Sequence, residues 1–248
     1  MTGLRVLAVP GLPEFTAGMA IGAEIASRIE LDDGDVVVVS QKIVSKAENR
    51  VRRLSSVAPD PTARELAASL GKEPAMVQLV LDESRQVLRA ERGILIVETN
   101  HGFVCANAGI DSSNLPEPGT VALLPEDPDA SARRIRDELE DATGKRLAVI
   151  VSDSFGRAWR IGQSEVAIGC AGLAPLDDWR GREDAEGHRL EATEIAIADE
   201  AAAAADLVRD KASRVPVVAV RGLRRFVTPE HGPGAAALRR PRGEDLFR

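Results

Sequence analysis

The chain has 248 residues, of which 44% are apolar and 29% are charged, a composition typical of one large or two small globular domains. This mixture excludes disordered and fibrous proteins. Because 39 acidic residues outnumber 32 basic ones, for a net charge of −7, we also expect no nucleic-acid partner.

Short apolar runs without polar alternation predict strands that are covered on both faces. In chain order, these runs are residues 6–9, 36–39, 94–97, 121–124, 147–151 and 217–220. Helical periodicity between some of the runs makes the fold class mixed α/β, with more than one lobe. The order of strands within a sheet does not follow from such patterns.

Helices are predicted at five places. They are residues 17–29, a stretch after Pro61, a stretch from Met76 towards Val87, a stretch from Asp129 to Gly144, and residues 193–211. In the fourth, Asp129 is expected to cap the N-terminus and Gly144 to end the helix. The alanines at 201–205 predict close packing of the fifth. Residues 228–248 are rich in Pro, Gly and Arg and are expected to form loop with a short final turn.

Cysteine usage and hydropathy exclude several classes of protein. Cys105 and Cys170 lie in apolar stretches and are interpreted as core residues, and no Cys/His cluster predicts a zinc site. The first residues show no secretion signal. The most apolar helix, residues 195–208, is interrupted by three acidic residues, so we expect no membrane-spanning segment. A cytoplasmic protein is therefore expected.

The segment CANAGIDSSN, residues 105–114, is the first candidate site. Asp111 offers a hard oxygen ligand for a divalent cation, and Asn107 and Asn114 offer amides to a base, ribose or carbonyl. The same composition is typical of an Asx-rich turn that caps its own backbone, so both interpretations stay open.

A second candidate site follows the apolar run at 147–151. Asp153 and Ser154 are placed where ligands gather in α/β sheets, and an acid beside a hydroxyl is suited to hold Mg²⁺ against phosphate oxygens. Arg157 and Arg160 offer guanidinium groups for phosphate or carboxylate. The alternative is an ion-paired strand end.

A third candidate site follows the run at 36–39. Ser40, Gln41, Lys42 and Lys46 are donors suited to phosphate, although a surface hairpin explains them equally well. The sequence contains no GxxxxGK[ST], GxGxxG or GxSxG motif. The two candidate aspartates, Asp111 and Asp153, offer only oxygen ligands, so a metal site there is predicted to bind Mg²⁺ or Mn²⁺ rather than zinc.

Several long motifs stand in one order along the chain. They are GLPEF (11–15), SQKIVSKAE (40–48), NAGIDSSN (107–114), SDSFGRAWRIGQSEVAIGCAGL (152–173), WRGREDAEGHRLEATEIAIADE (179–200) and VPVVAVRGL (215–223). Together they resemble the coenzyme F420-0:L-glutamate ligase (F420 γ-glutamyl ligase) family over almost the whole chain. RPRGEDLFR (240–248) resembles the corresponding end of the ligase module in actinobacterial members.

The resemblance implies one ligase domain over residues 1–248, without a fused flavin-binding reductase domain. It implies a mixed-sheet α/β fold with two lobes and an intertwined homodimer. The implied reaction joins L-glutamate to coenzyme F420-0 with GTP, and then adds further glutamate to F420-1 through γ-linkages. An acyl phosphate would form on the way, with release of GDP and phosphate. The family uses Mg²⁺ or Mn²⁺ and is stimulated by K⁺.

The motifs also carry residue assignments. The nucleotide contacts are Leu12, Pro13, Glu14, Phe15, Ser40, Gln41, Lys46 and Asn114. One metal is assigned to Asp111 and Asp153, and a second to Ser154, where the family commonly has Thr. Asp210 falls at a further metal-ligand position, although an exposed acid at a helix end explains it equally well.

Arg157 and Arg160 are assigned to anionic substrate or phosphate, and no general base is identified. Two other hypotheses for the function stay open. One is an NTP-dependent ligase that joins glutamate to another acid, such as a pterin-like or folate-like acceptor. The other is a GTP-binding module without turnover.

Overall fold

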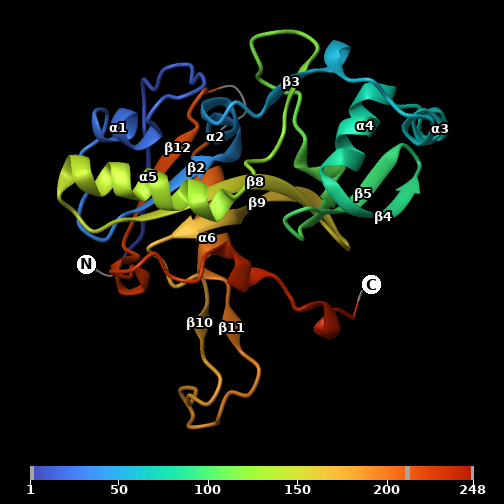
Figure 1. The fold of residues 1–248 in the computed structure, drawn as a ribbon. Coiled ribbons are helices and arrows are strands. Elements are labelled where there is room, and N and C mark those ends of the chain that lie inside the picture. Colours follow the sequence, from blue (N-terminus) through green and yellow to red (C-terminus); the bar gives the residue numbers. More distant parts are fainter. Residues whose placement is uncertain (1–2, 210–212, 247–248) are drawn as a thin grey trace.

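The computed structural model describes residues 3–209 and 213–246 and is built around a five-stranded mixed sheet (Figure 1). In spatial order the strands are β1 (Arg5–Ala8), β12 (Val217–Arg221), β2 (Val36–Ser40), β8 (Ala148–Arg157) and β9 (Arg160–Ala171). β2 and β8 run parallel, whereas the other neighbouring pairs are antiparallel. The predicted α/β class with a mixed sheet is therefore confirmed.

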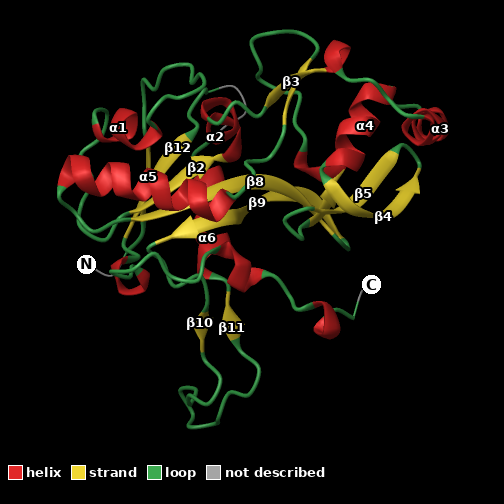
Figure 2. Cartoon of the chain, viewed as in Figure 1, coloured by secondary structure: helices red, strands yellow, loops and turns green. Residues whose placement is uncertain are grey.

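Helices cover both faces of this sheet, as the unbroken apolar runs predict (Figure 2). α1 (Ile21–Ala26), α2 (Gln41–Ala47) and α5 (Pro128–Thr143) share one core cluster with Val37 and Val39. α6 (Ile197–Asp206) packs on the opposite face with Val36 and Val38, where its small alanines permit the close approach that was predicted. Burial of each such valine contributes about 1.5–3 kcal/mol.

A separate core forms beside the main sheet. It contains α3 (Pro61–Leu70), α4 (Pro74–Asp82) and the antiparallel strands β4 (Ser84–Glu91), β5 (Ile94–Thr99) and β6 (Val104–Ala106). Leu95 and Val97 of β5 are fully buried there. β3 (Val51–Arg53) pairs with β7 (Thr120–Ala122) on the path between the two cores. The two-lobe arrangement and the dimer stay predictions.

The remaining elements are short. β10 (Asp177–Asp178) and β11 (Glu194–Ile195) form the base of a long ribbon that extends away from the main sheet (Figure 2). The 3-10 helices are η1 (Leu54–Ser56), η2 (Asn107–Gly109), η3 (Arg224–Phe226), η4 (Ala235–Leu238) and η5 (Arg242–Glu244). In the described part of the chain, no helix combines the length and apolarity that crossing a membrane requires.

Three helix predictions need correction at their ends. Val87 belongs to β4 rather than to α4, which ends at Asp82. The helix predicted for residues 17–29 spans only Ile21–Ala26. The helix predicted for residues 193–211 begins only at Ile197, because the residues before it pair with β10, and it ends at Asp206. Local periodicity does not report such pairings between distant segments.

The start of α5 also differs from the prediction. Its N-cap is Asp127, whose carboxylate accepts a hydrogen bond from the backbone N–H of Ala130 at 2.9 Å. Pro128 occupies the first helical position, so the cap must be the residue before it. The Asp129 carboxylate instead accepts backbone N–H groups from β9 and from the C-terminal segment, at 2.8 and 2.7 Å. Gly144 ends the helix in the left-handed conformation, as predicted.

The strand predicted to end at residue 151 continues to Arg157, and the expected strand exit is wrong. The polar residues from Ser152 onward pair with β9, a strand that the sequence analysis did not predict. This hairpin supplies the backbone hydrogen bonds that an isolated polar extension would lack. Likewise, the residues after Ser40 form α2 rather than the alternative surface hairpin.

Candidate functional site

A cavity of about 590 Å³ opens where β2 ends beside the parallel strand β8, which continues beyond this point. Ser40 of β2 is in register with Ser152 of β8, so the residues that follow Ser40 and those that follow Ser152 lie at the same end of this strand pair. Every described residue predicted as a nucleotide or metal contact lines this cavity. They are Leu12, Pro13, Glu14, Phe15, Ser40, Gln41, Lys46, Asp111, Asn114, Asp153 and Ser154.

Two lysines of α2 carry positive charge into the cavity. Lys46 Nζ lies 2.5 Å from the Glu14 carboxylate and also contacts the Asn114 carbonyl at 3.4 Å. Lys42 Nζ lies 2.8 Å from Asp111 Oδ2. Because these ammonium groups already neutralise carboxylates that line the cavity, an anionic ligand would compete with Glu14 and Asp111 for them.

Asp111 combines both interpretations that its sequence allowed. Its Oδ1 accepts the backbone N–H of Ser113 at 2.6 Å, which is the expected Asx turn, and its side chain also lines the cavity. Burial alone would raise the pKa of Asp111, but the hydrogen bonds from Lys42 and Ser113 outweigh it and lower that pKa. Asp111 is therefore an anion at neutral pH.

The pKa of Asp153 shifts in the opposite direction. Burial, and then the neighbouring Glu165 and Asp111 carboxylates, raise it to about 7. The two aspartates that are distant along the chain thus act on each other in one cavity. A cation bound between these acidic groups would offset their repulsion.

The donors fit Mg²⁺ or Mn²⁺ in one particular way. Among residues 3–209 and 213–246, no group of three or more His, Cys, Asp and Glu side chains is arranged to hold a metal by itself. Mg²⁺ is commonly held by one or two carboxylates together with substrate phosphates. If Asp111 and Asp153 provided the carboxylates, a metal at this site would depend on oxygens from a bound ligand.

Glu165 and Arg209 are among the cavity residues that the sequence analysis missed. Ser154 Oγ donates a 2.5 Å hydrogen bond to Glu165 Oε1, its register partner across the β8–β9 hairpin. Arg209 follows α6, donates to Ser152 Oγ at 3.1 Å and lies 3.7 Å from Glu165 Oε2. Only the unpredicted strand β9 would have indicated Glu165, and an arginine near a helix end carries no local signal.

The remaining predicted residues lie elsewhere. Arg157 and Arg160 pair at the exposed tip of the β8–β9 hairpin and do not line the cavity. The Arg157 guanidinium donates to the Ile161 carbonyl at 3.0 Å. Their assignment to an anionic substrate stays a prediction, and Asp210 lies outside the described residues.

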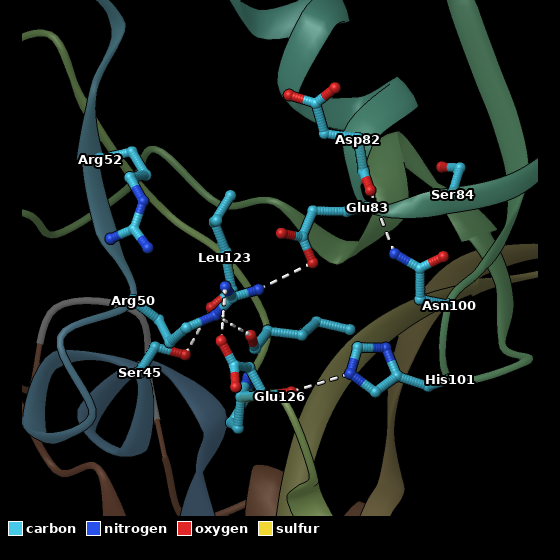
Figure 3. Close-up of polar contacts among 12 residues, drawn as sticks. Ser45, Arg50, Arg52, Asp82, Glu83, Ser84, Asn100, His101, Leu123 and Glu126 are labelled. Carbon is cyan, nitrogen blue, oxygen red and sulfur yellow. Dashed lines mark hydrogen bonds and ion pairs between the residues drawn. The ribbon is translucent and has the colours of Figure 1, made fainter. Parts of the chain in front are cut away.

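A buried arginine supports the wall that α2 forms (Figure 3). Arg50 donates to the Leu124 carbonyl at 2.9 Å and pairs with Glu83 at 2.7 Å and Glu126 at 3.4 Å. Ser45 of α2 donates to the Leu123 carbonyl at 2.6 Å and contacts Gln41 Oε1 at 2.9 Å. These bonds connect α2, the segment after β7 and the end of α4, and so position one side of the cavity.

Comparison with known proteins identifies the family to which the chain belongs. The model of the F420-0:Gamma-glutamyl ligase family matches residues 11–222, a range that includes every residue lining the cavity. The chain belongs to this family. The resemblance predicted from the motifs is thus confirmed, and so is the prediction of a ligase enzyme.

Relatives of this ligase match over most of their length. The Coenzyme F420:L-glutamate ligase of Methanothermobacter thermautotrophicus is 44% identical over 252 residues, covering 99% of both chains. That of Methanocaldococcus jannaschii is 41% identical, covering 96% of this chain and 94% of the relative. That of Archaeoglobus fulgidus is 44% identical, covering 89% and 88%.

Proposed function

We propose that the chain joins the amine of L-glutamate to the carboxylate of coenzyme F420-0 in a GTP-dependent reaction, and then adds further glutamate through γ-linkages. The observation that carries this proposal is the convergence of eleven predicted nucleotide and metal contacts on one cavity. The relatives named Coenzyme F420:L-glutamate ligase support the choice of substrates.

The chemistry requires an activated acceptor, because a carboxylate and an amine do not condense spontaneously in water. In the proposed first step, an acceptor carboxylate oxygen bonds to the γ-phosphorus of GTP while the bond between that phosphorus and the β–γ bridging oxygen breaks, releasing GDP. The glutamate amine then bonds to the acyl carbon, the acyl–oxygen bond breaks, and phosphate and a proton leave. Both steps are mainly problems of positioning and charge neutralisation.

The cavity residues have matching roles in this proposal. Lys42 and Lys46 would exchange their present carboxylate partners for nucleotide phosphates. Asp111, Asp153 and Ser154 would hold Mg²⁺ or Mn²⁺, which when bound supplies positive charge to the phosphoryl oxygens. Stimulation by K⁺ is proposed from the family resemblance alone, and no residue is assigned to it.

We also propose that the active form is a homodimer. The β10–β11 ribbon extends from the main sheet, and most of its loop residues are exposed (Figure 1). A second copy of the chain would cover such a ribbon. Light scattering coupled to size-exclusion chromatography would report the mass of the particle, and a mass of one chain across concentrations would contradict the dimer.

Mass spectrometry of the product tests the proposed reaction. The purified enzyme is incubated with F420-0, L-glutamate, GTP and Mg²⁺, and we expect adducts that increase by one glutamyl unit together with release of GDP. Parallel reactions replace GTP with ATP, or F420-0 with a folate acceptor. GDP release without adducts, adducts on folate alone, or nucleotide binding without GDP release would each reject the proposal in favour of another function.

A further inference from the structure

Several buried polar atoms of the cavity residues have no hydrogen-bond partner. In the described residues, five buried side-chain nitrogen or oxygen atoms have no hydrogen-bond partner, and three of these belong to cavity residues: Gln41 Nε2, Glu165 Oε2 and Arg209 Nε. Buried polar groups are normally paired, because an unpaired group loses its hydration without compensation. Atoms left unpaired around a cavity therefore indicate where a polar ligand binds.

Glu165 and Arg209 form an incomplete ion pair. Their side chains are only 7% and 8% exposed, yet the Arg209 guanidinium lies 3.7 Å from Glu165 Oε2, too far for a hydrogen bond. Glu165 Oε1 already accepts a hydrogen bond from Ser154 Oγ, and one Arg209 nitrogen already donates a hydrogen bond to Ser152 Oγ. One anionic acceptor and one cationic donor consequently remain available, on neighbouring side chains of the same cavity.

We propose that Glu165 and Arg209 recognise the α-ammonium and α-carboxylate groups of the incoming L-glutamate. This inference rests on the proposed function and assigns one of its substrates to a subsite. An α-amino acid carries a cationic donor beside an anionic acceptor, which is the complement of the Glu165–Arg209 pair. GTP and the F420-0 carboxylate carry no ammonium group, so neither would satisfy both partners.

The charge balance of the subsite agrees with a zwitterion. The formal charges of Glu165 and Arg209 cancel, and both side chains are largely buried. A zwitterionic ligand adds no net charge to this buried region, whereas a phosphate would add an uncompensated anion. A neutral site with separated charges therefore favours an amino acid over a nucleotide.

The location of the subsite also suits the chemistry. Glu165 Oε1 contacts Ser154, which adjoins Asp153, whereas Arg209 lies beside the other carboxylate oxygen, Oε2. An ammonium group on Glu165 would lie beside the side chains proposed to bind phosphoryl oxygens. The amine would thus be held near the acyl phosphate, with the α-carboxylate directed away from it towards Arg209.

Three variants test the assignment: Glu165→Gln, Arg209→Gln and the double variant. For each, KM is measured for glutamate, GTP and F420-0, and GTP affinity is measured by calorimetry. We expect the glutamate KM to rise about tenfold to a hundredfold, the range for loss of a hydrogen bond to a charged group. GTP affinity should stay unchanged in all three variants, and the Mg²⁺ dependence should stay unchanged in Arg209→Gln. Glu65→Gln and Arg64→Gln, both exposed on α3, are matched controls.

Ligand analogues separate the two halves of the subsite. Glutarate lacks the amine and 4-aminobutyrate lacks the α-carboxylate, and both are measured as competitors of glutamate. In the wild type, each should bind more weakly than glutamate. Glu165→Gln should reduce only the difference in affinity between glutamate and glutarate, which lacks the amine. Arg209→Gln should reduce only the difference between glutamate and 4-aminobutyrate, which lacks the α-carboxylate. The comparison has the form of a double-mutant cycle.

The outcomes distinguish this inference from the proposed function. If the wild-type enzyme forms no glutamyl product, the proposed function itself is refuted. An active wild type whose folded variants keep a normal glutamate KM, or change GTP affinity instead, overturns the subsite. The double variant leaves neither buried charge unpaired, so it should fold even if a single variant does not. Equal binding of glutarate, 4-aminobutyrate and glutamate by the wild type would overturn the subsite without any variant.

Discussion

Replacement of Asp153 with asparagine is expected to stabilise the ligand-free protein while it abolishes ligation. Burial, and then the Glu165 and Asp111 carboxylates, raise the pKa of Asp153 from 3.8 to about 7. Folding therefore disfavours the charged form of this side chain. An amide has nearly the same shape and carries no charge, but it is a far weaker ligand for a hard cation.

The pKa difference sets the size and the pH range of the effect. A rise from 3.8 to about 7 corresponds to an upper limit of about 4 kcal/mol, at about 1.4 kcal/mol for each pH unit. Between these two values, the folded state binds a proton that the unfolded state has released, so the wild type loses stability as pH rises. Below about pH 4, both states are protonated and the advantage of asparagine disappears.

Thermal unfolding without nucleotide or metal measures this prediction. At about pH 8, Asp153→Asn should melt several degrees above the wild type, and the two should converge at about pH 4. Asp178→Asn is the control, because Asp178 is exposed and its hydrogen bonds from Arg180 lower its pKa to about 2. Equal melting temperatures at pH 8, or an advantage that persists at low pH, would refute the electrostatic reasoning. Ligation at a near-normal rate across Mg²⁺ concentrations would refute the metal assignment.

Three further predictions concern the nucleotide and the scaffold. Lys46→Ala should raise the KM for GTP about tenfold through loss of a charge-assisted contact, with an unchanged KM for F420-0 in steady-state assays; an unchanged KM for GTP would contradict the assignment. Asp127→Ala should lower the free energy of unfolding, measured with urea, by about 1 kcal/mol through loss of the α5 cap. Asp129→Ala should lower it more, because two backbone N–H groups lose their acceptor. The reverse order would be evidence against these hydrogen-bond assignments. Arg50→Leu should cost about 3 kcal/mol, since it leaves the largely buried Glu83 without its partner, and an unchanged unfolding midpoint would show that this ion pair is not stabilising.

Local patterns predicted the candidate site well where the relevant residues are contiguous. All six apolar runs form strands in the structure, and the motif assignments identified eleven residues that line one cavity. The motifs succeed because the polar residues follow directly after β2 and within β8, so their placement depends on strands that short-range hydrophobicity already specifies. Asp111 and Asp153 accordingly meet as the sequence analysis proposed.

The misses share one cause, which is pairing between segments that are distant in sequence. Glu165 could not be assigned because β9 is polar in its first half, and only the antiparallel register with β8 places this residue opposite Ser154. Asp129 likewise binds β9 and the C-terminal segment instead of its own helix. The prediction that it caps its own helix is therefore wrong, and the cap is Asp127.

The amino-acid sequence by itself determined the α/β class, four of the five strands of the main sheet and the family, because hydrophobic runs and contiguous motifs are local properties. Tertiary structure alone decided the strand order, the continuation of β8 into a polar hairpin, and the union of Glu165 with Arg209. The physical reason is that buried charges depend on partners from other segments, and only the folded chain brings those partners within contact distance.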